Sequence, residues 1–567
     1  MKRRITGLVL ILCILLPMFA IGASAATTTS ISQFGITWTF SEAVECGQFA
    51  NGDYWVVGPV TITSITPATT VVDGASMHGS MINPPISTNN QGFDSRIGDG
   101  NTYNPDKNVA LLLPSLVVQP GSSLLSCESK LKTETNPQNN PQMNTIAILT
   151  VLDAPANEGD FRPPYIGAGN KALNWNKNDL DYTKLGSLAN PGGTYPLETV
   201  AARFERPWIE INLTWAGRNM HPDLNQRSLD NGVGAYGREL ANTIGAGLVA
   251  LQLNYTDAEK ETLLIRMVQY GIDVYGVAKM GGVWLNDGGH NMGRKMPMLL
   301  AGYMLDDENI MEYADGAKHP IFQEDHGMFY VSQKEVDQYI QISDGRARAI
   351  YTSDMIGMAE WGEKHRGTPT RDGSNWNAYY RDIAGTTMVA PAIAAHIMGL
   401  EEEWNSPHFF DYMDRLVGNQ TPTFSPWGNN IPAFALNMWK AYRGMGSELS
   451  RGISLASDYI VYDRSQYTYD AGGKTSGVTE ADLKDRKYTA AFTVTYTGEA
   501  ASGDITMFVA EYDQEGTMVA LTPKNVTCTK GIPLIIDQQF LLGTGSTYTV
   551  FLWETDSIVP LIKTRKL

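Results

Sequence analysis

The hydrophobic pattern changes its period twice along the chain, and these changes constrain the fold more than any other feature of the sequence. Alternation typical of strands runs through 26–153, helical spacing runs through 208–450, and short strands return in 486–567. The stretches between them, 154–207 and 451–485, are polar or rich in Pro, Gly and Asn and are predicted connections. We therefore expect a multidomain protein of mixed α and β structure, with a helical domain between two β-rich domains.

Both β-rich stretches are predicted to form β-sandwiches. In the first, Phe34–Phe40 alternates apolar and polar residues, and the apolar run Tyr54–Ile62 follows a turn signal at 51–53. In the second, strands recur about every ten residues and end at Phe551–Trp553, a spacing typical of immunoglobulin-like or fibronectin-like domains.

The middle stretch contains one helix with a complete start signal and several others with helical spacing. Thr256 and Glu259 form a capping box, and apolar residues follow at three- and four-residue intervals. Because glycine-rich loops join the helices, we expect helical hairpins around a ring, an α/α toroid-like domain, interrupted by a β-hairpin within 322–342. The other predicted helices are Tyr236–Leu253, Met296–Leu305, Asn377–Met398 closed by Gly399, His408–Val417 and Ile431–Arg443.

The first 25 residues have the pattern of a secretory signal. Met1–Arg4 is basic, an apolar run extends from Ile5 to about Ile21, and small residues precede a cleavage expected after about Ala25. We therefore expect a secreted, extracellular protein. An extracellular location is compatible with association with the cell surface. No later stretch has the roughly 20 apolar residues that span a bilayer, so no membrane insertion is predicted.

Charge and cysteine content exclude several classes of protein. The 60 acidic and 43 basic residues give a formal net charge of −17, which disfavours nucleic acid as a partner. After loss of Cys13 with the signal, Cys46, Cys127 and Cys528 are too few and too scattered for a thiolate zinc site. Cys46 and Cys127 could pair in an oxidising compartment. No ligand spacing singles out a metal site, and no cofactor is expected.

Seven of the eight histidines lie within 208–415, which places the predicted chemistry in the helical domain. The most informative motif there is the loop Asn286–Lys295, in which three glycines precede a predicted helix. Such a helix mouth binds anions or sugar hydroxyls. The alternative is a solvated turn whose side chains cap neighbouring helices. The loop supplies Asp287 and His290 as catalytic candidates and Arg294 and Lys295 as substrate-binding candidates.

A second cluster joins a loop to the start of a predicted helix. Tyr236 and Glu239 are three residues apart and therefore share one helix face. The alternative is that Glu239 forms a salt bridge that fixes the helix to its neighbour. The cluster supplies His221, Tyr236 and Glu239 as catalytic candidates and Arg218 and Asn219 as substrate-binding candidates.

Two further stretches add carboxylates and aromatic rings. Glu324 and Asp325 lie on a strand-like stretch, so only one of them can face a cleft, and Asp325 is preferred as a catalytic residue. The stretch 360–381 combines acids with aromatic faces, a combination that suits sugar rings, although its tryptophans could equally belong to the core. Its candidates are Glu360 for catalysis and His365, Trp376, Tyr380 and Arg381 for substrate binding.

This order of sandwich, helical ring and sandwich, with acids, His, Arg, Tyr and Trp in the ring, resembles secreted polysaccharide-degrading enzymes with an (α/α)-toroid catalytic domain. The resemblance implies a carbohydrate-active enzyme that takes a polysaccharide or oligosaccharide substrate. The sequence contains no Gly-x-Ser-x-Gly motif of serine hydrolases and no His-Glu-x-x-His motif of zincins, and no Gly-x-Gly-x-x-Gly spacing of dinucleotide-binding proteins follows a predicted strand.

Two mechanisms compete within this interpretation, and glycan binding without catalysis is a third alternative. An inverting glycoside hydrolase needs two carboxyl groups about 6.5–9.5 Å apart, whereas a polysaccharide lyase needs groups that neutralise a uronate and remove its α-proton. Residues 207–300 hold 8 basic and 9 acidic side chains and form no basic trough for a polyanion, so hydrolysis is placed ahead of elimination. The hydrolytic candidates are Asp287, Asp325, Glu239 and Glu360, and the elimination candidates are His221, His290, Arg294, Asn219 and Tyr236.

Overall fold

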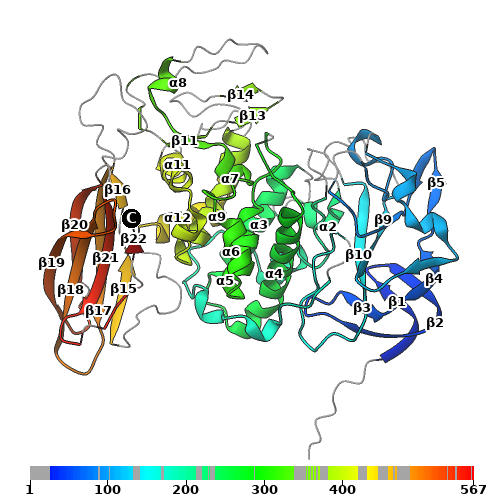
Figure 1. Ribbon diagram of the computed structural model, residues 1–567, viewed down its shortest axis with the longest axis horizontal. Coiled ribbons are helices and arrows are strands. Elements are labelled where there is room, and N and C mark those ends of the chain that lie inside the picture. Colours follow the sequence, from blue (N-terminus) through cyan, green and yellow to red (C-terminus); the bar gives the residue numbers. More distant parts are fainter. Residues whose placement is uncertain are drawn as a thin grey trace, which may run out of the picture.

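A central group of helices lies between two groups of strands (Figure 1). The predicted signal segment 1–25 lies outside the residues that the structure describes. The computed structural model describes residues 26–86, 90–100, 102–131, 141–167, 171–211, 220–227, 229, 236–286, 288–337, 353, 356–357, 359–361, 363–365, 368–370, 381–418, 431–444, 458–463, 466–468, 486–532, 534–542, 546–557, 559–562 and 565–566.

The N-terminal strands form one eight-stranded mixed sheet, at the right of Figure 1. Its order is β7-β9-β10-β3-β2-β4-β8, with β1 paired to β2. The β10–β3 pair is parallel, and the hairpin of β5 (Thr70–Val72) and β6 (Ala75–Met77) stands apart. The strands are β1 (Ala26–Gln33), β2 (Ile36–Gln48), β3 (Tyr54–Val57), β4 (Val60–Thr66), β7 (Ser80–Ile82), β8 (Leu116–Val118), β9 (Ser122–Ser129) and β10 (Met143–Leu152). Short 3-10 helices are η1 (Ile97–Gly100), η2 (Pro105–Lys107), η3 (Val109–Leu112), η4 (Lys177–Asp179) and η5 (Tyr182–Lys184).

Both faces of this sheet are buried, because successive side chains of a strand point to opposite faces. In β9, Leu125 and Cys127 join the large hydrophobic cluster of the helices, whereas Leu124 joins a second cluster on the other face. Cys46 also belongs to the second cluster. Cys46 and Cys127 are therefore free, buried thiols on opposite faces of the sheet, and the pairing that their sequence context allowed is absent.

The central helices confirm the predicted start signal and most of the predicted spans. The Thr256 hydroxyl accepts the Glu259 N–H, and the Glu259 carboxylate accepts the Thr256 N–H, as the capping box requires. Gly399 has φ +71° after the helix that it was expected to close. The longer helices are α3 (Gly237–Leu251), α4 (Asp257–Lys279), α5 (Lys295–Met304), α9 (Thr386–Ile397, preceded by a π-helix at Arg381–Gly385), α11 (Pro407–Gly418) and α12 (Ala433–Tyr442). The shorter ones are α1 (Leu197–Ala202), α2 (Asp223–Gln226), α6 (Glu308–Ala314), α7 (Gln323–His326), α8 (Gln333–Asp337) and α10 (Glu401–Trp404).

Glycine allows close approach at the main helix contacts. A Cβ at Gly271 in α4 would overlap the Pro297 carbonyl of α5, and a Cβ at Gly245 in α3 would crowd Ala390 in α9. The helices therefore pack as α4 against α5 and α3 against α9, with α12 also against α9. None of the helices in the described part of the chain combines the length and apolar character needed to cross a bilayer.

The predicted α/α toroid flanked by two β-sandwiches is wrong. The N-terminal strands make one mixed sheet, and one face of that sheet shares a single hydrophobic core with the helices. A buried ion network crosses the same boundary, since Arg162 Nε lies 2.7 Å from Asp53 Oδ2 and Arg162 Nη2 lies 2.5 Å from Asp273 Oδ2 in α4. Periodicity identified helices and strands, but it carries no information about which buried faces pack together.

The β-hairpin expected within 322–342 was also predicted wrongly, because its first strand pairs with a distant segment. Residues 323–326 form the short helix α7. The strand β11 (Met328–Tyr330) pairs with the distant β12 (Ala359–Trp361), and β13 (Glu363–His365) pairs with β14 (Thr368–Thr370). The second predicted hairpin strand, at 339–342, lies outside the described residues.

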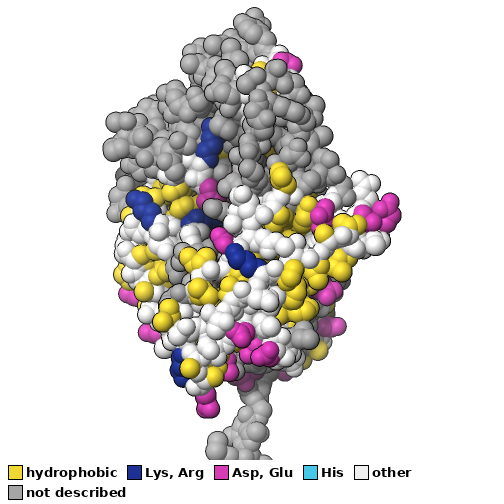
Figure 2. Space-filling model, turned by 90° about the vertical axis from the view of Figure 1, so that its left-hand side faces the viewer, with side chains coloured by type: hydrophobic (Ala, Val, Ile, Leu, Met, Phe, Trp, Pro, Cys, Tyr) yellow, Lys and Arg dark blue, Asp and Glu magenta, His cyan; other side chains and the backbone are white. Residues whose placement is uncertain are grey.

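The C-terminal strands form two sheets at the left of Figure 1. Tyr488 and Phe492 in β17 and Met507 in β18 share one buried cluster, which joins the two sheets. Exposed hydrophobic side chains, including Val519 and Ile535, lie on β19 and β20, on the side of the molecule seen in Figure 2. The strands are β15 (Tyr459–Asp463), β16 (Gln466–Thr468), β17 (Arg486–Tyr496), β18 (Ser502–Tyr512), β19 (Met518–Thr529), β20 (Leu534–Leu542), β21 (Thr547–Glu554) and β22 (Arg565–Lys566).

Candidate functional site

The glycine loop between α4 and α5 is held in place by α7. Gln323 Nε2 donates to the Gly288 carbonyl at 2.8 Å, and Gln323 Oε1 accepts the Asn291 N–H at 3.2 Å. The next residue of α7, Glu324, accepts the Gly293 N–H at 2.6 Å. Gly288 and Gly293 have φ of +58° and +90°, where a side chain would be strained. The loop therefore has a defined structure. It precedes the N-terminus of a helix, α5, as the sequence predicted.

His290 lies in this loop and contacts Tyr236 at the start of α3. The ring centroids are 4.6 Å apart with an interplanar angle of 57°, and both residues are half-buried. A Cβ at Gly237 would overlap the Gly289 carbonyl and the His290 backbone, so glycine is needed for the loop to reach the helix. Two catalytic candidates from different stretches of the sequence are thus side by side.

A buried carboxylate that sequence analysis missed lies beneath the loop. Glu210 Oε1 accepts the Tyr270 hydroxyl at 2.8 Å and Arg294 Nε at 3.0 Å. Glu210 Oε2 accepts Trp284 Nε1 at 3.0 Å. Burial, the largest single influence, would raise the pKa of Glu210, but the Arg294 guanidinium, His221 and the Trp284 hydrogen bond together outweigh burial and hold the pKa well below its usual range. Glu210 is therefore an ionised partner of Arg294 in the interior.

His221 completes this network as a neutral ring. The Ile209 N–H donates to His221 Nδ1 at 3.1 Å, which places the ring hydrogen on Nε2. Nε2 lies 3.3 Å from Glu210 Oε1, but the angles at this contact are not those of a hydrogen bond. Burial lowers the pKa of His221 despite the nearby carboxylate, and the side chain is fully buried. His221 and Arg294 therefore meet around Glu210 inside the protein.

Arg294 also connects this interior network to the loop backbone. Its Nη1 donates to the carbonyls of Met292 at 2.7 Å and His290 at 3.3 Å. Since Arg294 is 2 % exposed, it lies too deep to meet a substrate directly in this arrangement. Its contacts position the segment that carries His290.

Lys295 and Asp325 form a second buried pair. Lys295 Nζ lies 2.7 Å from both oxygens of Asp325 and donates to the Trp404 carbonyl at 2.8 Å. The Trp404 indole N–H also donates to Asp325, at 3.1 Å. Burial is the main influence on both groups: it raises the pKa of Asp325 to about 6 and lowers that of Lys295. These two candidates neutralise each other and join α5, α7 and α10.

Glu324 differs from its neighbour because no described lysine or arginine forms an ion pair with it. Residues 323–326 form the helix α7 and both acids are buried, so the strand on which the predicted opposite orientation of Glu324 and Asp325 rested is absent. Within the described structure, Glu324 Oε2 is a buried oxygen without a hydrogen-bond partner. Burial raises the pKa of Glu324 to about 7. This carboxyl group can hold a proton near neutral pH.

The two remaining acidic candidates form ion pairs with arginines. Glu239 Oε1 accepts Arg238 Nη1 at 2.7 Å, a salt bridge within α3 that does not fix the helix to a neighbouring helix. Glu360 Oε1 accepts Arg415 Nη1 of α11 at 2.5 Å and is fully buried. The Glu360 carboxylate therefore joins β12 to α11.

The structure thus joins candidates in three separate groups: Tyr236 with His290, His221 with Arg294, and Lys295 with Asp325. Within the described residues, no group of three or more His, Cys, Asp and Glu side chains could hold a metal ion. The candidates Asp287, Arg218, Asn219, Trp376 and Tyr380, and the side chains of His365 and Arg381, lie outside the described part of the chain.

Comparison with known proteins gives little further information. No protein-family model and no curated protein matches the chain. Solved structures with local similarity include proteins described as a beta-galactosidase, a beta-glucuronidase and a beta-glucosidase. A protein described as a beta-galactosidase from Bacteroides fragilis shows 13% identity and a TM-score of 0.14 over 21% of this chain and 16% of its own.

Two other solved structures are similar to a shorter and a longer part of the chain. A beta-glucuronidase from glycoside hydrolase family 2 shows 17% identity and a TM-score of 0.13 over 19% of this chain and 10% of its own. A beta-glucosidase from Kluyveromyces marxianus shows 12% identity and a TM-score of 0.14 over 36% of this chain and 30% of its own. The chain thus spans less than a third of each protein, and TM-scores this low carry no argument about fold or activity.

Proposed function

We propose that this protein is a carbohydrate-active enzyme that cleaves glycosidic bonds, with Tyr236 and His290 as its proton-transfer pair. The observation that supports the proposal is the contact between these rings, 4.6 Å apart and half-buried, where the glycine loop meets the first turn of α3. Imidazole is the side chain that most often transfers protons in enzymes, and the tyrosine phenol can also do so. The loop is held rigidly enough from both sides to keep His290 in place.

The geometry supports β-elimination on a uronate polymer best. In this reaction His290 removes the proton next to the uronate carboxylate, and the bond to the glycosidic oxygen breaks as a C=C bond forms. Tyr236 donates its proton to the leaving oxygen, which departs as a hydroxyl group. His290 then releases its proton to solvent, and the Tyr236 phenolate takes one from solvent. Arg218 and Asn219 remain the proposed partners of the substrate carboxylate.

Elimination is placed ahead of hydrolysis because most of the acidic candidates already form ion pairs with cationic side chains. Glu239, Glu360 and Asp325 are each paired with a cation, at 2.7, 2.5 and 2.7 Å. A hydrolase needs a proton-holding acid and a second, water-activating carboxylate. Hydrolysis remains the second candidate on one observation, since the pKa of about 7 suits Glu324 to the role of the acid.

A screen against uronate polymers, xylans and neutral glucans tests the proposal. Elimination produces reducing ends together with the ultraviolet absorbance of an unsaturated sugar, whereas hydrolysis produces reducing ends alone. The absence of both signals across a broad panel would contradict an enzymatic role and would favour glycan binding. The proposed location is extracellular, on the basis of the signal pattern in 1–25, and N-terminal sequencing of the exported protein checks cleavage after about Ala25.

A further inference from the structure

We infer that Glu324 is a positioning residue of the proposed reaction centre, and that its proton regulates how firmly the loop of His290 is held. This inference rests on the proposed function and adds a means of regulation to the same site. Glu324 belongs to α7, and its side chain is fully buried, so it does not meet a substrate in this arrangement. Its influence on the reaction passes through the loop.

Two adjacent residues of α7 hold the two ends of the stretch that carries His290. Gln323 Nε2 donates to the Gly288 carbonyl at 2.8 Å, before His290 in the chain. Glu324 Oε1 accepts the Gly293 N–H at 2.6 Å, after it. Because His290 lies between these two contacts, a change at either end changes the position of its ring.

The same stretch of the loop packs directly on α3. A Cβ at Gly293 would lie 3.2 Å from the Ala241 Cα of α3, and a Cβ at Gly289 would lie 2.6 Å from the Tyr236 ring. The loop therefore has no slack against this helix. A small shift of Gly293 changes the contact between the Tyr236 and His290 rings, whose centroids are 4.6 Å apart.

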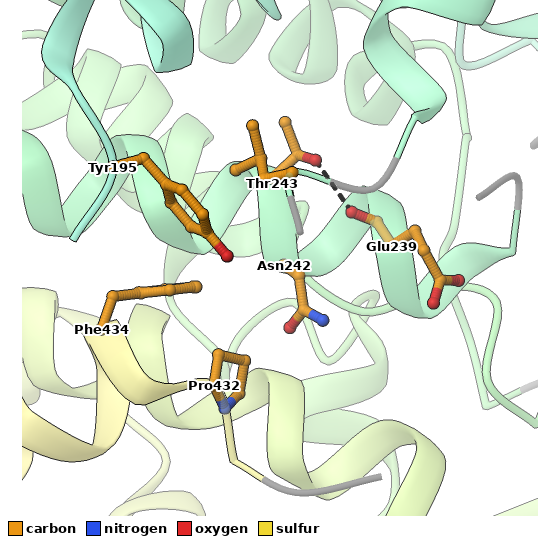
Figure 3. A pocket seen from close by; sticks show the side chains of 7 residues that line it. Tyr195, Glu239, Asn242, Thr243, Pro432 and Phe434 are labelled. Carbon is orange, nitrogen blue, oxygen red and sulfur yellow. Dashed lines mark hydrogen bonds between the residues drawn. The ribbon is translucent and has the colours of Figure 1, made fainter. Parts of the chain in front are cut away.

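α3 is held on its other sides, so the loop is the part that can shift. A Cβ at Gly245 of α3 would lie 2.6 Å from the Ala390 Cβ of α9 and 3.7 Å from the Phe434 ring of α12. Figure 3 shows Phe434 and Tyr195 beside Thr243 of α3, where these residues line a small hollow. Since α9 and α12 fix the helix, the firmness of the site depends on the contacts of the loop with α7.

The charged groups around Glu324 are already paired with other groups. Lys295 of α5 lies 2.7 Å from Asp325, and Arg294 of the loop is paired with the buried carboxylate beneath the loop. Asp315, which follows α6, acts on both Lys295 and Asp325. Among the described residues, Glu324 Oε2 has no hydrogen-bond partner and no cation is paired with this carboxyl group. The Gly293 N–H is thus the contact most sensitive to the charge of Glu324.

The proton of Glu324 changes the strength of that contact. Burial raises the pKa of Glu324 to about 7, so the ionised and the protonated states are both populated near neutral pH. A hydrogen bond to an ionised acceptor is roughly twice as strong as one between neutral groups. The ionised carboxylate therefore holds Gly293, and with it the loop, more firmly than the protonated carboxyl group does.

The variant Glu324→Gln tests the inference, because glutamine keeps the size of the side chain and an oxygen for the Gly293 N–H but does not ionise. Glu308→Gln, at an exposed glutamate in the first turn of α6, is the matched control. NMR of the full chain, labelled at glycine nitrogen and at the histidine ring carbons, follows the loop without turnover. In the wild type and the control, we expect the Gly293 amide signal to shift with a midpoint near pH 7 and the His290 ring signal to shift with it, in addition to the titration of the ring itself. In Glu324→Gln this common shift should be absent.

The pH dependence of cleavage is the second readout. On a polymer that the wild type cleaves, the ratio of the wild-type rate to the Glu324→Gln rate should rise about tenfold from about pH 6 to about pH 8, the effect of one hydrogen bond on the barrier. The ratio of the wild-type rate to the Glu308→Gln rate should stay constant over the same range.

Three results would overturn the inference. The first is a Gly293 signal that does not shift near pH 7 in the wild type, or that shifts equally in Glu324→Gln. The second is a rate ratio that does not change with pH. The third is a loss of about a hundredfold in Glu324→Gln at every pH with unchanged His290 signals, because Glu324 would then act on the substrate itself. Failure of the proposed function looks different, since no polymer is then cleaved while the Gly293 and His290 signals still follow Glu324.

Discussion

Glu210 Oε1 lies 3.0 Å from Arg294 Nε in the interior, and Arg294 in turn holds the backbone of His290. The Glu210 side chain is 6% exposed and that of Arg294 is 3% exposed, so neither charge is solvated on its own. Removal of one partner of a buried pair leaves an uncompensated charge and is far more destabilising than removal of both.

Glu210→Gln is therefore expected to lower the free energy of unfolding by about 3–5 kcal/mol, because the Arg294 guanidinium loses its counter-charge. Urea unfolding followed by circular dichroism measures the change. In the double variant Glu210→Gln, Arg294→Met the loss should be clearly smaller than the sum of the two single losses. Additive losses would show that the two groups do not interact.

Glu324→Gln is expected to change the pH dependence of stability. The folded pKa of Glu324 is about 7, above its unfolded value, so the folded protein retains a proton that the unfolded chain has lost. The wild type should therefore lose stability as pH rises from about 4.5 to 7, by up to about 3 kcal/mol, and the variant should lack this contribution. Unfolding free energies of both proteins at pH 4.5 and 8 test it. A constant difference between them would contradict the raised pKa.

Gly237→Ala is expected to displace the loop from α3. The new Cβ would overlap the Gly289 carbonyl, and overpacking of this kind is unfavourable by about 1–3 kcal/mol. Glycan cleavage should fall at least tenfold, because the His290 and Tyr236 rings separate. Gly444→Ala is the matched control, since its Cβ meets no atom of the described residues within 4 Å. Equal activity of the two variants would show that this close approach is unimportant.

The cysteines are expected to be thiols throughout. Cys46 and Cys127 lie in different clusters on opposite faces of the N-terminal sheet, and burial raises the pKa of Cys127 far above its usual range. Alkylation of the unreduced, denatured protein should label the peptides with Cys46, Cys127 and Cys528, whereas the native protein should react slowly. Recovery of a Cys46–Cys127 linked peptide by mass spectrometry would contradict this fold.

Local features of the fold could be predicted from the sequence because their causes are local. The capping box of Thr256 and Glu259 needs two residues three apart, and the end of α9 needs one glycine at Gly399. The toroid prediction failed because packing depends on contacts far apart in sequence. Arg162 links Asp53 to Asp273, and no periodicity within 154–207 indicates that this segment lies inside a shared core.

The site was predictable to a similar extent. The proximity of Tyr236 and His290 follows from two motifs that the sequence already marked, the helix start and the glycine loop. Glu210 was missed because its partners are spread over residues 221–294 without fixed spacing. The one local signal was a glutamate between Ile209 and Ile211, an acid in an apolar run, which indicates a buried charge that needs a partner.

The most direct test of the central claim is the rate of unsaturated-product formation by Tyr236→Phe and His290→Ala, on the polymer of the panel that the wild type cleaves. Each variant is expected to lose about a hundredfold in kcat, the range for a lost proton-transfer group, with an unchanged unfolding midpoint. Tyr512→Phe, a tyrosine of β18 in the C-terminal strands, should retain wild-type turnover. Wild-type rates in both Tyr236→Phe and His290→Ala would contradict the assignment of this pair as the reaction centre.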